Sequence, residues 1–147
     1  MEEFIIQFIK KQTCASICCA DKKGNPYCFS CFYAFNSDEG LLYYKSSSGT
    51  RHSELISENP SVAGTILPDK LNKIMVKGIQ FEGIVLPDFD PLSKNAAAFF
   101  YKQHPIALAV PGEIWTIQIN YVKFTDNSLG FGKKITWARK EEMANAS

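Results

Sequence analysis

Residues 46–53, which read SSSGTRHS, combine hydroxyl groups, a flexible glycine, a guanidinium and an imidazole. Proteins hold a phosphate dianion with hydroxyl and backbone N–H donors, the positive N-terminal end of a helix, and an arginine that can bind two oxygens. Cations at a helix N-terminus are unfavourable unless an anion offsets them. Arg51 and His52 side by side therefore favour a phosphate site. The alternative is an ordinary Ser or Thr N-cap, with both basic side chains solvated.

Five cysteines are the second chemical feature, and all of them lie within residues 14–31. A four-thiolate metal module built from Cys14, Cys18, Cys28 and Cys31 is one interpretation. The spacing is poor for such a site, because strand residues three apart point to opposite faces of a sheet. We therefore expect free thiols that act as small apolar side chains in a packed barrel.

The two histidines, His52 and His104, are too few for a three-histidine zinc site. His104 precedes Pro105 at the end of an expected helix, where a solvated or capping role is typical. Hydrolase, phosphate-loop and dinucleotide fingerprints are missing from the sequence. We accordingly expect no metal site and no essential protein nucleophile.

The periodicity of the chain predicts the elements that position these residues. Apolar spacing with acids first and lysines last predicts a helix over 3–12. A Gly-Asn-Pro turn between two β-prone runs predicts a hairpin. Short connections favour an antiparallel barrel over a parallel sheet. The expected strands are 14–20, 27–35, 41–45, 61–67, 74–86 with a glycine bend, and 113–124, with 131–137 as a last strand or arm; further helices are expected over 51–59 and 92–102.

Length and charge limit the function classes. The 147 residues, with 46% hydrophobic and 21% charged residues, are typical of one folded domain, residues 1–147. A net charge of +1 gives no reason to expect a nucleic-acid partner. The apolar runs are far shorter than the ~20 residues that cross a bilayer, and the acidic start is unlike a signal peptide. We expect a cytoplasmic protein with no membrane partner. Its fold class should be mainly β, a six- to seven-stranded antiparallel barrel with short peripheral helices.

Residues 44–66, YKSSSGTRHSELISENPSVAGTI, resemble the hallmark segment of the FMN-binding split-barrel family, the pyridoxamine 5′-phosphate oxidase-like proteins. In that family a strand ends in Ser or Thr, a basic pair opens a helix, and Asn-Pro closes it. The similarity in element order extends from residue 1 to about residue 137. The Thr-Arg-His-Ser run is most similar to a subgroup of small members. The resemblance implies a split barrel with FMN as cofactor.

The resemblance also implies particular contacts. Ser46 and the pair Arg51 and His52 would hold the phosphate, and histidine in place of the usual lysine would make the second charge titrate near neutrality. Backbone groups near residues 27–31 would bond the polar edge of the isoalloxazine ring. Trp115 lies on the strand that reaches the flavin from the partner subunit in that family. The implied cofactor-binding set is Ser46, Thr50, Arg51, His52, Tyr27, Cys28, Phe29, Ser30, Gln80 and Trp115.

The function implied is a flavin-dependent oxidoreductase, with FMN at a homodimer interface and a small-molecule substrate or reduced nicotinamide as reaction partner. Residues 126–134 lack the basic motif of the enzymes that oxidise pyridoxamine phosphate, so that substrate is not expected. Some relatives bind haem or a deazaflavin instead, and the shortage of histidines counts against haem. The alternatives are a non-catalytic flavin carrier or redox sensor, and the thiolate metal module.

Overall fold

The structure is a computed structural model that describes residues 1–130 and 134–141. Its strands are β1 (Cys14–Ala20), β2 (Pro26–Asn36), β3 (Leu41–Ser46), β4 (Ser61–Ile66), β5 (Lys77–Leu86), β6 (Glu113–Asp126) and β7 (Lys134–Ala138). The α-helices are α1 (Glu3–Lys11), α2 (Arg51–Glu58) and α3 (Ala96–Gln103), and short 3₁₀ turns are η1 (Pro91–Ser93), η2 (Pro105–Ala109) and η3 (Asn127–Leu129).

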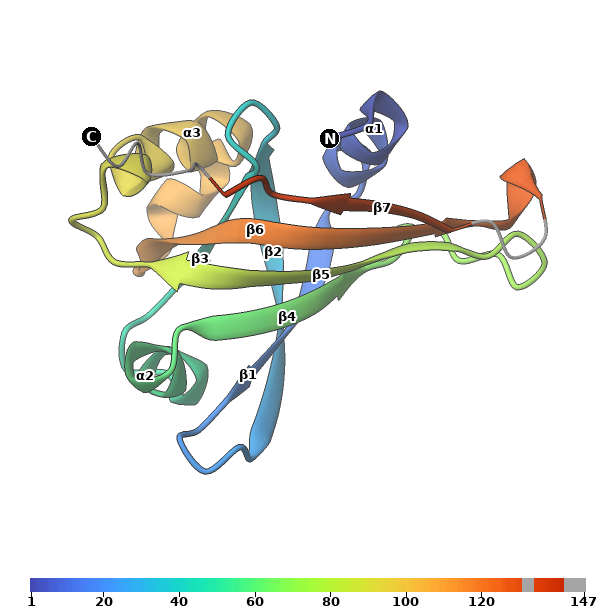
Figure 1. Ribbon diagram of the computed structural model, residues 1–147. Helices are drawn as coiled ribbons and strands as arrows, with labels where there is room; N and C mark the ends of the chain where they lie inside the picture. Colours follow the sequence, from blue (N-terminus) through green and yellow to red (C-terminus); the bar gives the residue numbers. More distant parts are fainter. Residues whose placement is uncertain (131–133, 142–147) are drawn as a thin grey trace, which may run out of the picture.

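The strands form one antiparallel sheet in the order β3-β2-β1-β4-β5-β6-β7. The first strand in that order, β3, also pairs with β6, so six strands close into a barrel and β7 is added outside it. Figure 1 shows the strands with the helices at the periphery. The predicted fold class is confirmed. No helix in the described part of the chain has the length and apolarity needed to cross a membrane.

Every second side chain of the strands points into the barrel, and these buried apolar side chains stabilise the fold. Ile17 on β1, Phe81 on β5 and Ile117 on β6 are buried in one apolar cluster. The amphipathic helix α1 adds Ile5 and Ile9, both fully buried, to the same cluster. Helix α3 instead packs outside the barrel, against a separate group of buried residues on β2 and β3. The apolar residues of the two helices are thus buried on different sides of the barrel wall.

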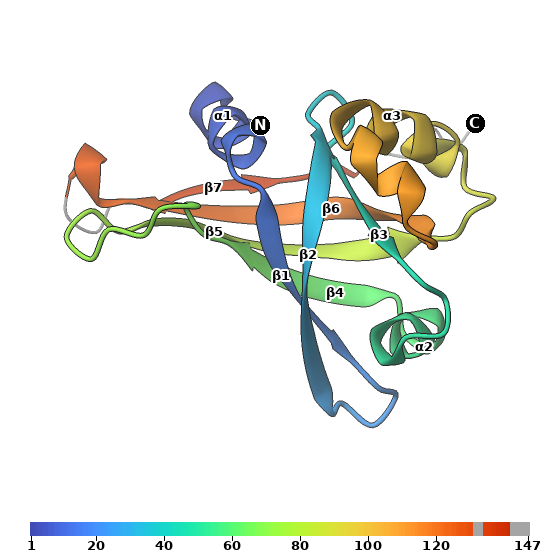
Figure 2. The same ribbon diagram turned by 180° about the vertical axis from the view of Figure 1, so that it is seen from behind.

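The β1–β2 hairpin extends beyond the barrel beside α2 (Figures 1 and 2). Asp21 closes its turn by accepting hydrogen bonds from the backbone N–H groups of Lys23 and Asn25, each at 2.9 Å. Gly24 takes φ +89°, a conformation that glycine adopts without steric cost. Strand β2 has 11 residues, but β3 pairs only with Tyr33–Asn36. The earlier part of β2 therefore pairs with β1 alone.

The two largest errors in the predicted boundaries have local reasons. The strand expected from residue 74 begins at Lys77, because the Asn72 side chain accepts hydrogen bonds from the N–H groups of Ile74 and Met75 and forms a turn. The helix expected over 92–102 begins at Ala96, because Asp90 captures the N–H of Leu92 in a 3₁₀ turn. The glycine bend in β5 is confirmed by a register shift between Glu82 and Gly83. Residues 131–133 of the expected last strand lie outside the described residues.

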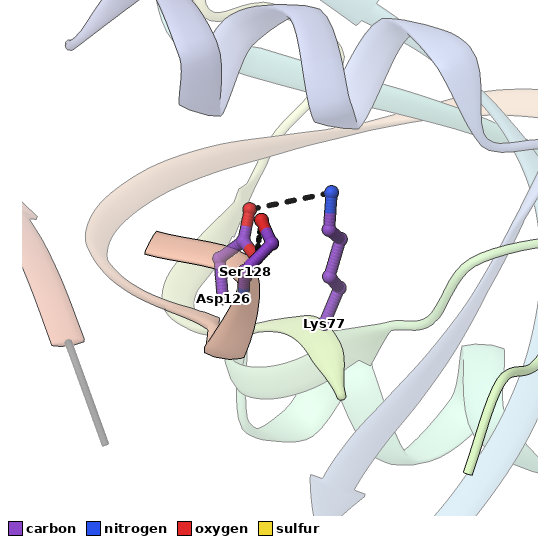
Figure 3. A network of polar contacts seen from close by, with 3 residues as sticks. All are labelled: Lys77, Asp126 and Ser128. Atoms are coloured by element: carbon purple, nitrogen blue, oxygen red, sulfur yellow. Dashed lines mark hydrogen bonds and ion pairs between the residues drawn. The ribbon is translucent and has the colours of Figure 1, made fainter. Parts of the chain in front are cut away.

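Asp126 ends β6 in a compact polar network (Figure 3). Its carboxylate accepts hydrogen bonds from the backbone N–H of Ser128 at 2.8 Å and from the Ser128 hydroxyl at 2.5 Å. Lys77, on the neighbouring strand β5, lies 3.4 Å from the other carboxylate oxygen. Burial favours the neutral acid, but the Ser128 and Lys77 contacts outweigh burial and lower the pKa of Asp126.

Replacing Asp126 with asparagine should lower the free energy of unfolding by about 1 kcal/mol at pH 7, because asparagine still accepts the Ser128 hydrogen bonds but lacks the charge that strengthens them and pairs with Lys77. A lowered folded-state pKa contributes stability above the unfolded-state value, and that contribution disappears as pH falls through the folded-state value. The difference from wild type should therefore shrink at pH 3, as measured by urea unfolding. Asp88→Asn, at an exposed position, is the control. An Asp126→Asn deficit of the same size at both pH values would contradict the assignment.

Candidate functional site

The end of β3 and the start of α2 form a hydroxyl-rich loop. Thr50 is the N-cap of α2, and its Oγ1 accepts the N–H of Ser53 at 3.3 Å. The hydroxyls of Thr50 and Ser53 lie 2.7 Å apart, and Ser53 also donates to the Ser47 carbonyl at 2.7 Å. The N-cap interpretation thus describes Thr50 correctly. The cap leaves the N–H groups of Arg51 and His52 without an acceptor among the described residues.

His52 is fixed in the loop by two neighbours. Its Nε2 lies 2.7 Å from the hydroxyl oxygen of Ser46, at the end of β3. Its ring stacks on Phe29 of β2, with centroids 3.8 Å apart and planes 9° from parallel. Burial lowers the pKa of His52, so the imidazole is uncharged at neutral pH. The sequence predicted titration near neutrality, and the structure moves it to lower pH.

Arg51 is the cation that remains at this helix start. Its side chain is exposed, and its guanidinium carbon lies 5.4 Å from the centroid of the Tyr27 ring on β2. Within residues 1–130 and 134–141, it forms no ion pair with a carboxylate. The guanidinium donors are therefore free to bind an anion beside the two open backbone N–H groups.

Strand β2 leaves one edge open next to this cluster. Tyr33 donates its N–H to Thr13 across the hairpin, and backbone hydrogen bonds alternate in direction along an antiparallel strand. Cys28, Ser30 and Phe32 therefore direct their N–H and C=O groups away from β1. Strand β3, which would pair with them, is in register only from Tyr33 onward. Within the described part of the chain these groups have no partner strand, so an open row of donors and acceptors results.

A cavity of about 670 Å³ lies along this open edge. Ser30 and Phe32 line it from β2, and Lys45 and Ser46 line it from β3. The opposite wall is the segment after α3, including Ile106, which is 86% exposed. That segment is held in place by Lys45, whose ammonium donates to the carbonyls of Ala107 and Val110. The cavity combines an apolar wall with polar groups at one end.

The wall formed by residues 103–111 was not predicted from the sequence. A usable signal is present, because the apolar run between Pro105 and Pro111 belongs to no predicted core element. Exposed apolar groups of this kind often mark a ligand or partner site. His104 was expected to be solvated or to act as a cap. Its backbone does cap α3, but its Nε2 lies 2.8 Å from the Tyr33 carbonyl oxygen, which joins the segment to β2.

The ten predicted residues fall into two groups. Tyr27 and Phe29 contact the basic side chains of α2, so they belong to the cluster around Ser46. Trp115 also belongs there, since its indole N–H donates to the Ser46 carbonyl at 3.1 Å in the same chain. The side chain of Cys28, and that of Gln80 on β5, instead line a second cavity on the outer face of the sheet.

The second cavity has a mixed character and a volume of about 340 Å³. Its other polar lining residues include Ser16, Cys18, Thr65, Glu82 and Tyr121. Ser30 also faces this side, with its hydroxyl oxygen 3.4 Å from that of Ser16. Within one chain, Gln80 therefore does not reach the Ser46 cluster. Ser30 borders both regions, because its backbone lies at the open edge and its side chain faces the outer cavity side.

The cysteines are less buried than the sequence suggested. Cys19 is buried in the barrel, but Cys14 and Cys28 are exposed and Cys18 and Cys31 are intermediate. The expectation of core thiols was wrong for the exposed pair, because even-numbered residues of this hairpin face outward. The described residues hold no cluster of three or more His, Cys, Asp or Glu side chains suited to a metal ion. The thiolate metal module therefore lacks a ligand set there.

The fold and the cluster define a small antiparallel barrel protein with a cavity between an open strand edge and the segment after α3, and with a basic helix start next to Ser46 at one end of that cavity. No protein-family model matches the chain. A UPF0306 protein of Photorhabdus laumondii is 38% identical over 137 residues, covering 93% of this chain and 95% of that protein. A UPF0306 protein of Yersinia enterocolitica is 33% identical over 139 residues, covering 95% and 94%. The chain belongs to the UPF0306 family.

Solved structures with the same fold carry names of several cofactor proteins. A heme binding protein from Mycobacterium smegmatis aligns with a TM-score of 0.73 at 12% identity, over 89% of this chain and 55% of that chain. An FAD-binding protein from Mesorhizobium loti gives 0.66 at 18%, over 86% and 95%. An F420 reductase gives 0.58 at 13%, over 83% and 98%. At these identities the likeness shows a shared fold.

Proposed function

We propose that this chain binds FMN, with the phosphate at the start of α2 and the ring along the open edge of β2. The observation that carries this proposal is that Ser46 lines the edge cavity and also contacts His52 of the basic cluster. A single ligand with an anionic end and a flat polar-edged ring would use both features. Similar folds named for haem, FAD and F420 support a cofactor role for this architecture.

The residues present fit the phosphate of FMN. Arg51 offers a guanidinium that pairs with no carboxylate of the described residues, and the N–H groups of Arg51 and His52 point from the helix start, where the helix dipole favours an anion. Ser46 adds a hydroxyl group close to the imidazole of His52. A bound dianion would raise the pKa of His52 and so recruit a second cation.

The residues along the edge cavity also fit the isoalloxazine ring of FMN. The outward N–H and C=O groups of Cys28, Ser30 and Phe32 can pair with the carbonyl and N–H groups at the ring's polar edge. The apolar segment around Ile106 would cover the opposite side and limit water access. When bound, FMN supplies hydride or single-electron transfer, and the protein supplies position, electrostatics and water exclusion.

The proposed activity is that of an oxidoreductase that uses reduced nicotinamide or another small-molecule substrate, in a homodimer with FMN at the interface. A non-catalytic flavin carrier or sensor is the alternative. Reduced nicotinamide added to the FMN-loaded protein without oxygen distinguishes a nicotinamide-dependent oxidoreductase from a carrier, because the oxidoreductase bleaches the flavin absorbance and a carrier leaves it unchanged. Light scattering tests the dimer, and a monomer mass would remove that part of the proposal.

The cofactor itself is tested by saturating the protein separately with FMN and riboflavin and passing each sample through a desalting column. We expect nearly one FMN per chain in the absorption spectrum and much less riboflavin, because riboflavin lacks the phosphate that Arg51 would bind. Equal retention of both would contradict the phosphate site. Loss of both would contradict the flavin proposal, and parallel samples with haem and F420 would show whether either is retained instead.

A further inference from the structure

Cys18 on β1 and Cys28 on β2 occupy directly opposite positions in the hairpin. The pair three steps toward the turn, Asp21 and Asn25, is hydrogen-bonded from the N–H of Asp21 to the carbonyl of Asn25 at 3.1 Å. Hydrogen-bonded and non-hydrogen-bonded pairs alternate along antiparallel strands. Cys18 and Cys28 are therefore a non-hydrogen-bonded pair, in which the Cα atoms are closest, at about 4.5 Å.

At the non-hydrogen-bonded pairs of this hairpin, the two side chains lie next to each other on the outer face of the sheet. At the next such pair, the hydroxyl oxygens of Ser16 and Ser30 lie 3.4 Å apart. At the cysteine pair, the register places the two side chains next to each other on this face, and burial and secondarily the neighbouring Cys28 thiol raise the pKa of the Cys18 thiol. Both line the outer cavity, with Cys28 exposed and Cys18 half-buried.

We propose that Cys18 and Cys28 form a reversible dithiol–disulfide pair that reacts with low-molecular-weight disulfides. A Cα separation of about 4.5 Å lies within the range that a disulfide spans. The exposed Cys28 reacts first. Its thiolate attacks a small disulfide RS–SR, forms a mixed disulfide, and releases one RS⁻.

Cys18 completes the reaction from the opposite strand. After giving its proton to water, its sulfur attacks the Cys28 sulfur and displaces the second RS⁻. The two protein thiols lose two electrons and two protons in total, and the small disulfide takes them up as two RSH molecules. The product links the two strands of the hairpin across the pair.

The other three cysteines are poorly placed for this chemistry. Cys19 is buried inside the barrel. Burial and secondarily Cys14 raise the pKa of Cys31 to about 12, which keeps that thiol protonated. Cys14 lies opposite Phe32 and so has no cysteine partner across the hairpin. The geometry therefore selects one pair.

The test uses the purified full chain with oxidised glutathione. We expect the intact mass to fall by two hydrogens, peptide mapping to give a Cys18–Cys28 crosslink, and dithiothreitol to restore the starting mass. Cys14→Ser should behave like wild type. Cys18→Ser should instead stop at a glutathione adduct on Cys28, because the resolving thiol is missing.

Three results would overturn the proposal. One is an unchanged content of five free thiols after oxidation. Another is a crosslink between other cysteines or between chains. The third is a glutathione adduct that persists on Cys28 in the wild-type chain. None of these measurements involves flavin, so the outcome is independent of the proposed function.

Discussion

FMN should bind at least tenfold more weakly to Arg51→Ala than to wild type. Charge-assisted hydrogen bonds contribute about 1.5–3 kcal/mol, and about 1.4 kcal/mol corresponds to a factor of ten in Kd. Arg51 is the exposed cation at the start of α2 that pairs with no carboxylate in the described structure, so its loss removes the fixed positive charge of the proposed phosphate site. Titration with FMN, followed by quenching of flavin fluorescence, measures the change.

Two comparisons separate phosphate binding from general damage. Riboflavin, which has no phosphate, should bind wild type and Arg51→Ala with similar affinity. Lys22→Ala removes a cation from the exposed hairpin turn and should leave the Kd for FMN unchanged. Arg51→Ala that binds FMN as tightly as wild type would place the phosphate elsewhere. An equal loss for FMN and riboflavin would mean that Arg51 acts through the ring or the local fold.

Gly83→Ala should destabilise the barrel by about 3 kcal/mol, the upper range for overpacking a close-packed interior. A Cβ atom at this position would lie 2.5 Å from the carbonyl oxygen of Gln118 and 3.0 Å from Cγ2 of Ile117. The first neighbour is backbone of β6, so it moves only if the β5–β6 pairing is distorted. Urea unfolding at neutral pH, with the midpoint and the slope both recorded, tests the effect.

Gly49→Ala is the matched control for that substitution. A Cβ atom there meets no atom within 4 Å, and Gly49 does not have a positive φ. Its free energy of unfolding should stay within about 0.5 kcal/mol of wild type. If Gly83→Ala unfolds at the same urea concentration as Gly49→Ala, the β5–β6 contact is more adaptable than the structure indicates.

Local patterns were sufficient to predict most of the barrel. The Gly-Asn-Pro turn between two β-prone runs predicted the β1–β2 hairpin, and the segment that ends in Asn59 and Pro60 predicted α2 and β4. Errors arose where one side chain captured a backbone N–H group. Asn72 did so before β5, and Asp90 did so before α3. Periodicity carries no information about such single contacts.

The site was harder to predict because it depends on where distant strands separate. The sequence indicated the basic pair and its neighbouring hydroxyls, which the structure brings together around Ser46 and His52. The open edge of β2 depends on β3 leaving its register after Tyr44, a long-range property. The closure of the barrel also decides which face of β2 is outside. It places the side chains of Cys28 and Gln80 at the outer cavity, away from the Ser46 cluster.

The open edge also affects how the ligand-free chain behaves at high concentration. Natural edge strands are usually protected by charges, prolines or a covering element, because an unpaired edge can pair with another chain. Cys28, Ser30 and Phe32 carry no charge, and the Phe32 side chain is 67% exposed. The uncovered edge is therefore an aggregation hazard at the same place as the proposed flavin site. Its yield and solubility in a host should rise with the supply of whatever molecule covers that edge.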